Sequence, residues 1–340
     1  MSVHDTKVPL LLTKELRQRN IIVPQMTEYD ALGSVWRPYL MYFHTPDYTS
    51  TVVNTDTEGF RFSTFKSQRV SPTSLVTDRE HHVLVGGSTA FGVGAESDDA
   101  TIASHLAQIT QTPWLNMAGR AFSSVQEYLL FAAYQAELPR LGTVVMLSGF
   151  NNLFLAQRSL PFAQPLGSFF YQQAFQTGME AVTQGRRELL KRALFGTPTS
   201  VPQQQRDLAE AIRLAVALTR RSLQLWSFIA QARGLKLVYA LQPTAHWSGR
   251  TTHPKEAELF GLLERIDPAL AATLTRLDDA CYRQYREQLA MMCAELGVSF
   301  IDVNERLRSQ NSASEWWHVD RVHYTGVGHR RIADALAQNL

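Results

Sequence analysis

From residue 82 onward, short apolar runs of strand length alternate with longer stretches of helical pattern. The apolar runs lie at residues 82–86, 114–118, 143–149, 235–241 and 298–303, and the helical stretches at about 99–111, 123–138, 206–233, 268–296 and 325–338. Strands separated by helices form βαβ units, whose consecutive strands run parallel. The alternation therefore predicts a flavodoxin-like three-layer α/β/α sandwich with a five-stranded parallel sheet. In such a sheet, ligands bind outside the carboxyl ends of the strands.

Two segments depart from this alternation. Residues 1–80 hold an aromatic and β-branched stretch broken by turn formers, which predicts a β-rich N-terminal extension packed on a main domain of residues 81–340. Within it, the segment "NTDTEGFRFS" has no function that we infer beyond packing. Residues 152–205 form a long insertion between the third and fourth strands, which predicts a helical lid. Its Phe-rich and Leu-rich start favours an apolar acyl or alkyl group in the substrate, although the same side chains would also serve to pack a lid onto the body.

The composition narrows the classes of partner. The chain has 45% hydrophobic and 19% charged residues, and its formal net charge is +2 with no long run of one sign, so a nucleic-acid surface is not indicated. No apolar run reaches the roughly 18 residues of a membrane span, and the N-terminus lacks the pattern of a secretory signal. We expect a cytoplasmic protein whose two cysteines, Cys281 and Cys293, are buried thiols. No oligomeric state is predicted.

Distinct polar or glycine-rich segments follow the expected strands. They read "GGSTAFG", "NMAGRAFSS", "SGFNNL" and "QPTAHWSG", and "WWHVDRVHYTGVGH" precedes the last helix. The carboxyl ends of parallel strands meet at one edge of a sheet, so these segments are expected to lie close together. They would bring together five residues that could take part in a reaction, Ser88, Gly119, Asn151, Asp320 and His323.

These residue types suit acyl transfer. A serine hydroxyl becomes a nucleophile when a base takes its proton, and a histidine is such a base near neutral pH. Asp320 stands three positions before His323 and could orient that imidazole while its other nitrogen faces Ser88. The oxyanion of the reaction needs hydrogen-bond donors, for which the N–H groups of Ser88 and Gly119 and the amide of Asn151 are candidates. This chemistry requires no cofactor and no metal.

In this order, the blocks "GGST", "NMAG", "GFNN" and "DRVH" resemble those of the SGNH hydrolase superfamily, also called GDSL-like lipases and esterases. The resemblance spans residues 82–338 and implies the roles given above for Ser88, Gly119, Asn151, Asp320 and His323. The chain departs from the family pattern in three places. Its first block is the variant GGST, Asn152 stands where the family usually has aspartate, and Tyr324 follows the histidine where proline is common.

Other interpretations of the same residues are weaker. Ser88 could instead cap a helix. A phosphate-binding loop is also not indicated, because "GGSTAFGVG" lacks the Lys-Ser/Thr ending of a P-loop. A metal site from His318, Asp320 and His323 has no standard zinc spacing and no evident fourth ligand. His329 falls in a helical stretch and is expected on the helix surface.

The chain is therefore expected to be a serine hydrolase that cleaves a small-molecule ester or thioester, free or carrier-bound. Four further residues are candidates for its substrate pocket, Arg120, His246, Trp247 and His318. An acyltransferase could use the same acyl-enzyme with an alcohol or amine acceptor. A non-catalytic binding protein on the same fold would hold Ser88 and His323 beyond hydrogen-bond reach.

Overall fold

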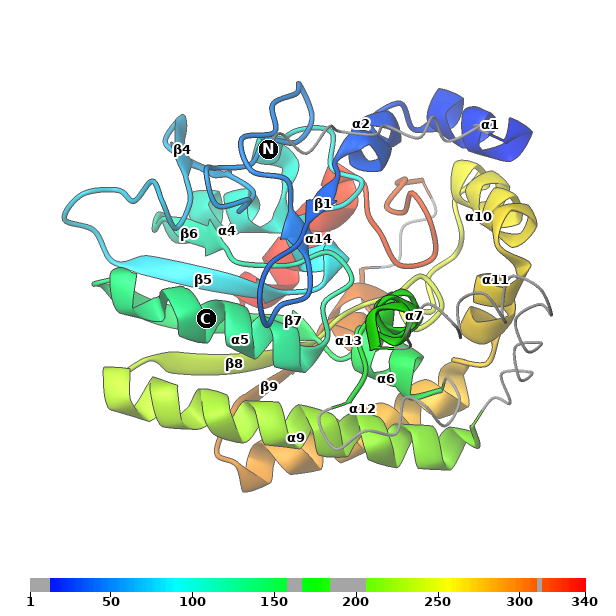
Figure 1. The fold of residues 1–340 in the computed structure, drawn as a ribbon. Coiled ribbons are helices and arrows are strands. Elements are labelled where there is room, and N and C mark those ends of the chain that lie inside the picture. Colours follow the sequence, from blue (N-terminus) through cyan, green and yellow to red (C-terminus); the bar gives the residue numbers. More distant parts are fainter. Residues whose placement is uncertain (1–12, 158–166, 184–205, 311–313) are drawn as a thin grey trace.

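The computed structural model describes residues 13–157, 167–183, 206–310 and 314–340. A parallel sheet forms its centre, with the strand order β6-β5-β7-β8-β9 (Figure 1). The strands are β5 (His81–Gly86), β6 (Trp114–Asn116), β7 (Leu141–Ser148), β8 (Lys236–Leu241) and β9 (Ser299–Asp302). This is the strand order of flavodoxin-like folds. The predicted five-stranded three-layer sandwich is confirmed, and each expected strand is present.

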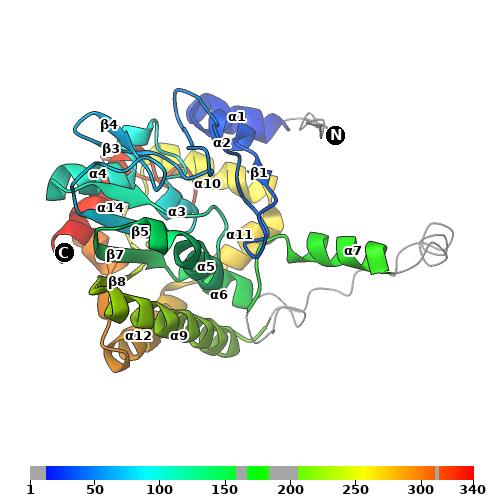
Figure 2. The same cartoon turned by 60° about the vertical axis from the view of Figure 1, so that its left-hand side comes forward.

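Helices cover both faces of this sheet (Figure 1). Those after β5 are α3 (Ser88–Phe91), α4 (Ile102–Thr110), α5 (Ser124–Tyr134), α6 (Phe150–Ala156), α7 (Gln172–Thr183), α9 (Leu208–Arg233), α10 (Pro254–Ile266), α11 (Pro268–Thr275), α12 (Asp279–Glu295), α13 (Val303–Arg308) and α14 (Gly326–Ala337), with short 3₁₀ turns at Asp98–Ala100 and Gln135–Glu137. Helices α4 and α14 cover one face, and α5, α9 and α12 cover the other (Figures 1 and 2). Because both faces are covered, the strands read as continuous apolar runs.

Two helical segments differ from the sequence expectation. The single helix expected over 268–296 is broken into α11 and α12, because the Asp278 carboxylate accepts the Cys281 N–H at 2.8 Å and starts a new helix. Helix α10 lies in a segment for which no helix was predicted. It begins with Pro254 and a reciprocal cap between His253 and Glu256, a pairing that the usual Ser/Thr capping signature does not include.

The N-terminal segment contains helices as well as strands. Helices α1 (Lys14–Ile22) and α2 (Met26–Ala31), which the sequence did not predict, precede two antiparallel pairs, β1 (Ser34–Val35) with β2 (Phe43–His44) and β3 (Ser63–Phe65) with β4 (Gln68–Val70). Their buried side chains belong to the same apolar core as the sheet, among them the fully buried Val53 and Phe60. The segment therefore packs on the body of the protein.

A buried arginine links this segment to the rest of the protein through hydrogen bonds and an ion pair. Arg61, from "NTDTEGFRFS", is fully buried, and its guanidinium donates to the Asp98 carboxylate at 2.9 Å and to the Tyr29 hydroxyl at 2.8 Å. It also donates to the carbonyls of Val52 and Gly92. The Asn54 amide donates to the same Asp98 carboxylate at 2.7 Å. The segment thus joins α2 to the chain that follows α3, which gives it a structural role.

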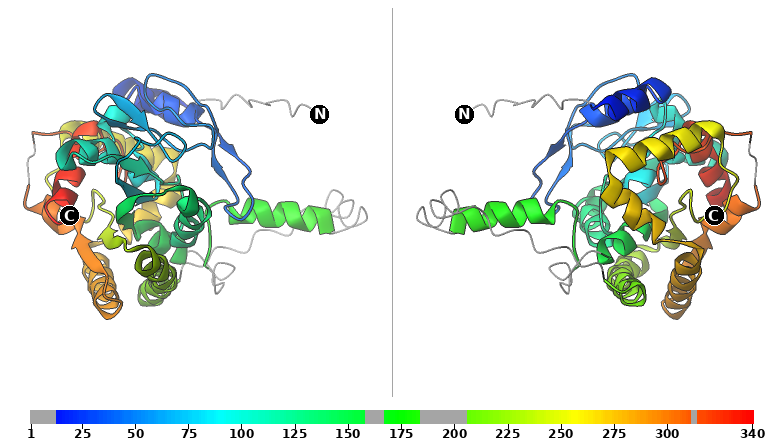
Figure 3. Two further views of the ribbon diagram at one scale, coloured as in Figure 1. Left: turned by 90° about the vertical axis from the view of Figure 1, so that its left-hand side faces the viewer. Right: turned by 90° about the vertical axis from the view of Figure 1, so that its right-hand side faces the viewer.

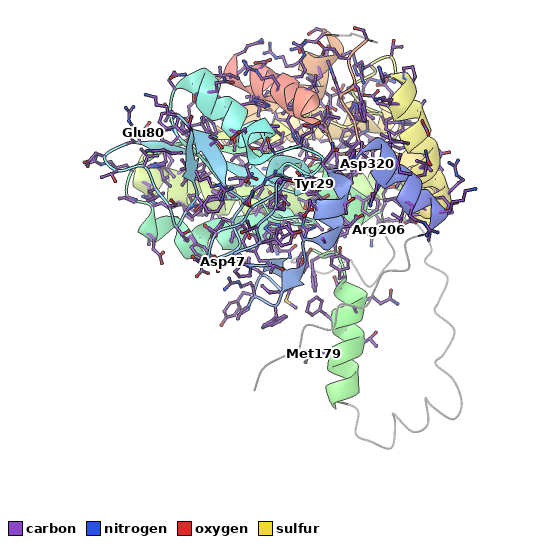
Figure 4. The ribbon with its side chains drawn as sticks, turned by 90° about the horizontal axis from the view of Figure 1, so that it is seen from above. Tyr29, Asp47, Glu80, Met179, Arg206 and Asp320 are labelled. Atoms are coloured by element: carbon purple, nitrogen blue, oxygen red, sulfur yellow. The ribbon has the colours of Figure 1, made fainter. Side chains whose placement is uncertain are left out.

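Only part of the expected lid can be described. Residues 158–166 and 184–205 lie outside the described residues. Within the described part, α6 is buried against the body, whereas α7 extends away from it (Figures 2 and 3). Met179, labelled on α7 in Figure 4, is 62% exposed.

Two further properties of the residues that the structure describes concern membrane-spanning helices and the cysteines. None of its helices is both long enough and apolar enough to cross a membrane. Cys281 and Cys293 are both buried and unpaired, as expected.

We predict that Arg61→Met lowers the free energy of unfolding by about 3–5 kcal/mol, because it leaves the Asp98 carboxylate buried without its cation. Denaturant unfolding of the variant and the wild type measures this. Arg69→Met is the control, because Arg69 is exposed and outside the network. Equal losses in both variants would contradict the fastening role.

Candidate active site

Ser88 lies directly beyond the carboxyl end of β5, at the first position of α3. The turn that places it requires glycine. Gly86 has a φ of +151°, and a Cβ there would lie 2.2 Å from the Leu147 carbonyl oxygen. A Cβ on Gly87 would lie 2.6 Å from the Asn151 amide nitrogen. The two glycines therefore let the serine approach both the neighbouring strand and Asn151.

His323 connects Ser88 to Asp320. Its Nε2 is 2.7 Å from Ser88 Oγ, and its Nδ1 is 2.6 Å from Asp320 Oδ2. With the Nδ1 proton donated to the carboxylate, Nε2 is left to accept the serine proton. Ser88 and His323 are 235 positions apart in sequence, and the fold brings them into hydrogen-bond contact.

The Asp320 carboxylate is held ionised. Burial raises its pKa, but the opposing charge and hydrogen bond of His323 lower it further, as do the N–H groups of Val322 and His323, so that the pKa is about 2. Asp320 Oδ1 accepts both N–H groups at 2.8 Å. These backbone bonds fix the carboxylate relative to the imidazole, which keeps the histidine in one orientation.

A second buried carboxylate holds the segment that leads to Asp320. Glu256 on α10 accepts the N–H groups of Trp317 and His318 at 2.8 and 3.0 Å and pairs with the Arg250 guanidinium. His318 Nδ1 lies 3.2 Å from the same oxygen, Glu256 Oε1. His318 is buried, and burial lowers its pKa. It was expected in the substrate pocket, but it supports the loop instead and does not line the cavity.

Two consecutive asparagines in the first turn of α6, Asn151 and Asn152, have different partners. The Asn151 amide donates one N–H to the Phe122 carbonyl at 2.8 Å, which leaves its second N–H for a ligand. The Asn152 amide instead donates to the Ser124 and Thr219 hydroxyls, both at 2.8 Å. Asn151 lines the cavity that contains Ser88, and Asn152 does not.

Gly119 does not have the free N–H that was expected of it. Its N–H donates to the Gly86 carbonyl at 3.0 Å, and the next N–H, that of Arg120, donates to His44 Nε2 at 3.1 Å. Ala121 N–H has no hydrogen-bond partner among the described residues, and Ala121 lines the cavity beside Ser88 and Asn151. Ala121 has a φ of +59°, which lies in the left-handed region that residues other than glycine rarely adopt. Ala121 could not be found from the sequence, because alanine gives no signal of a left-handed conformation.

The other pocket candidates are placed differently from the expectation. Arg120 lines the cavity, but its guanidinium donates to the carbonyls of Tyr29, Leu32 and Gly33 at the end of α2. It therefore fixes the N-terminal segment rather than facing an anionic substrate. His246 is exposed and lies outside the cavity. Trp247 is fully buried and donates its indole N–H to the Leu277 carbonyl at 2.9 Å.

His329 also corrects an expectation. It was placed on the surface of the last helix, but it is fully buried within α14, and burial lowers its pKa well below the usual value. It therefore takes no part in the site and belongs to the core.

The catalytic candidates share one cavity. Its volume is about 540 Å³, and its walls include Ser88, Ala121, Asn151, Asp320 and His323. Residues of the N-terminal segment, including Met26, Tyr29 and Leu32, complete it; Tyr29 and Asp320 are labelled in Figure 4. A larger depression of about 960 Å³ lies beside β3 and α4, but it contains none of these groups. In the part of the chain that the structure describes, no cluster of three His, Cys, Asp or Glu residues could hold a metal ion.

No family model and no curated protein matches the chain. Among solved structures, it is similar to an acetyl xylan esterase, with 13% identity, 76% of this chain and 99% of the other covered, and a TM-score of 0.42. An extracellular lipase from Streptomyces rimosus has 16% identity, 77% and 100% coverage and a TM-score of 0.44. A lipolytic protein of the G-D-S-L family from Veillonella parvula has 12% identity, 77% and 98% coverage and a TM-score of 0.43.

A buried acid behind the site yields a pH-dependent prediction. Glu127 on α5 accepts the hydroxyl of Ser148, the last residue of β7, at 2.9 Å, and burial raises its pKa from 4.5 to about 8. Between these two values the unfolded chain ionises while the folded protein keeps the proton. Stability is therefore lost as the pH rises through this range, by roughly 1.4 kcal/mol for each pH unit.

Glu127→Gln removes the titrating group and retains an acceptor for Ser148. We expect the free energy of unfolding of the variant, relative to the wild type, to increase steadily from pH 5 to pH 8. Denaturant unfolding at several pH values measures this slope. A constant difference across the range would show that Glu127 ionises normally in the folded protein.

Proposed function

We propose that this chain is a serine hydrolase of the SGNH type, which cleaves an ester or thioester through an acyl-enzyme on Ser88. The observation that carries the proposal is the continuous contact from Asp320 through His323 to Ser88, with separations of 2.6 and 2.7 Å. A non-catalytic binding module would have no need of this contact and was expected to lack it.

The reaction follows from the positions of these groups. His323 Nε2 takes the Ser88 proton as Oγ attacks the acyl carbon, and the ionised Asp320 stabilises the resulting imidazolium. The imidazolium then protonates the leaving oxygen or sulfur as its bond to the acyl carbon breaks. A water molecule, deprotonated by the same imidazole, releases the acyl group. In an acyltransferase, an alcohol or amine would take the place of this water.

The oxyanion of each tetrahedral intermediate needs donors that are free before substrate binds. Three groups fit this description, the N–H of Ser88, the N–H of Ala121 and the second amide proton of Asn151. The N–H of Ser88 belongs to the first turn of α3 and has no hydrogen-bond partner among the described residues. The proposal therefore replaces Gly119, expected from the family pattern, with Ala121.

The nucleophile is tested by labelling with a fluorophosphonate probe. We expect labelling of the wild type and none of Ser88→Ala. For His323→Ala we expect labelling and ester hydrolysis to fall by about 10⁴-fold or more, because the base is lost. Equal labelling of Ser88→Ala and wild type would refute the assignment. Partition of the acyl group between water and an added alcohol then separates hydrolysis from transfer.

The oxyanion role is tested by comparing two neighbouring asparagines. We expect Asn151→Ala to lower kcat by roughly 100–1,000-fold, because a donor to the oxyanion is removed. Asn152→Ala is the matched control, since its amide holds only Ser124 and Thr219; we expect a lower Tm and a change in kcat of a few-fold at most. A similar kcat for the two variants would argue against the role of Asn151.

A further inference from the structure

The cavity around Ser88 is lined by both polar and apolar side chains. Its polar groups include the catalytic candidates. The apolar side chains come from elements far apart in the sequence, among them Phe150, Phe154, Phe170, Leu263, Leu270 and Leu274. A ligand that fills this space must therefore carry a reactive polar group and an extended apolar group.

One part of the apolar wall is a row of aromatic rings that begins beside Asn151. Phe150 and Phe154, which flank Asn151 on α6, have ring centroids 6.0 Å apart. Phe154 stacks in turn on Phe170, with centroids 5.6 Å apart and an interplanar angle of 9°. Phe150 and Phe154 are almost fully buried, at 6% and 3% exposure, so packing holds them in place. All three rings line the cavity that contains Ser88.

The other part consists of leucines of two helices. Leu263 lies on α10, and Leu270 and Leu274 lie on α11. Helices α6, α10 and α11 lie at the same end of the molecule in Figure 1. Leu270 and Leu274 are four positions apart and therefore share one face of α11. This face and the aromatic row form two walls that an unbranched chain could contact at once.

The charges of the cavity favour an uncharged chain. Among the described lining residues, Arg120 is the cation, and its guanidinium donates to three backbone carbonyls. Asp30, an acidic lining residue, is paired with Arg19. The remaining lining carboxylate, Asp320, is bonded to His323. Neither the aromatic row nor the leucine wall presents a charged group to pair with an ionised substrate tail.

We propose, on the basis of the function proposed above, that these two walls bind the acyl chain and make the enzyme selective for linear acyl groups of medium length over acetyl. The leaving group must lie beside His323 to receive its proton, so the aromatic row that starts on the Asn151 helix receives the acyl substituent. Each methylene moved from water into such a wall contributes roughly a fourfold gain in kcat/KM. From butanoyl to octanoyl, four methylenes give a gain of roughly 250-fold.

The test uses p-nitrophenyl acetate, butanoate and octanoate, in which only the acyl chain changes. For the wild type we expect kcat/KM to rise from acetate to octanoate. Leu270→Trp narrows the cavity at a partly exposed position, and we expect it to lower kcat/KM for octanoate by at least about tenfold and for acetate by less than about twofold. Phe170→Ala, which shortens the aromatic row, is expected to lower octanoate selectivity in the same direction.

The control variant is Phe228→Ala, on α9 outside the cavity and 67% exposed, which should leave all three rates unchanged. A second series, ethyl and octyl acetate, varies only the alcohol. A selective effect of Leu270→Trp on octyl acetate, with p-nitrophenyl octanoate unaffected, would overturn the proposal by placing the alcohol on these walls. Equal wild-type rates for acetate and octanoate would also overturn it.

Fluorophosphonate labelling of Ser88 in every variant separates the two levels of the proposal. A labelled wild type with no chain-length preference refutes only the acyl-chain assignment. An unlabelled wild type refutes the hydrolase function and the acyl-chain assignment together.

Discussion

The close approach of β5 and β7 at their carboxyl ends is the contact on which the candidate site depends. Gly86 pairs with Leu147 across the two strands, and a Cβ on Gly86 would come within 2.2 Å of the Leu147 carbonyl oxygen. Because no side chain intervenes, α3 and α6 begin next to each other, with Ser88 at the start of one helix and Asn151 at the start of the other. The candidate nucleophile and the candidate amide donor are thus positioned by the edge of a sheet rather than by a long loop.

Buried charges attach the remaining parts of the site to this edge. Glu256 holds the backbone that leads to Asp320, and Arg120 holds the end of α2 against the cavity. Arg61 joins the N-terminal segment to Asp98. Each of these charges makes several hydrogen bonds, which offsets the cost of removing it from water. The sequence left the role of residues 1–80 open, and in the structure Met26, Tyr29 and Leu32 of this segment line the cavity.

Much of the fold and part of the site could be predicted from the sequence. The five strands were found because a buried parallel strand is a continuous apolar run, and the sheet edge then grouped Ser88, Asn151, Asp320 and His323. The prediction of a residue's role failed where that role depends on a hydrogen-bond or packing partner that is distant in the sequence. Gly119 and Ala121 lie in the same loop, and their different roles depend on the Gly86 carbonyl, which takes the N–H of Gly119. His329 and Trp247 were misjudged because helical periodicity does not reveal what packs on a helix or a loop from outside.

The sequence by itself determined the layer architecture and the chemical types gathered at one edge, because apolar periodicity and chain order are properties of local residues. Only the tertiary structure decided which donors are free, which histidine faces Ser88 and which side chains surround the space beside it. The hydrogen bond between Ser88 Oγ and His323 Nε2 spans 2.7 Å, although the two residues are 235 positions apart in the sequence. Such a distance is set by the packing of the strands, loops and helices between them, and no local pattern encodes it.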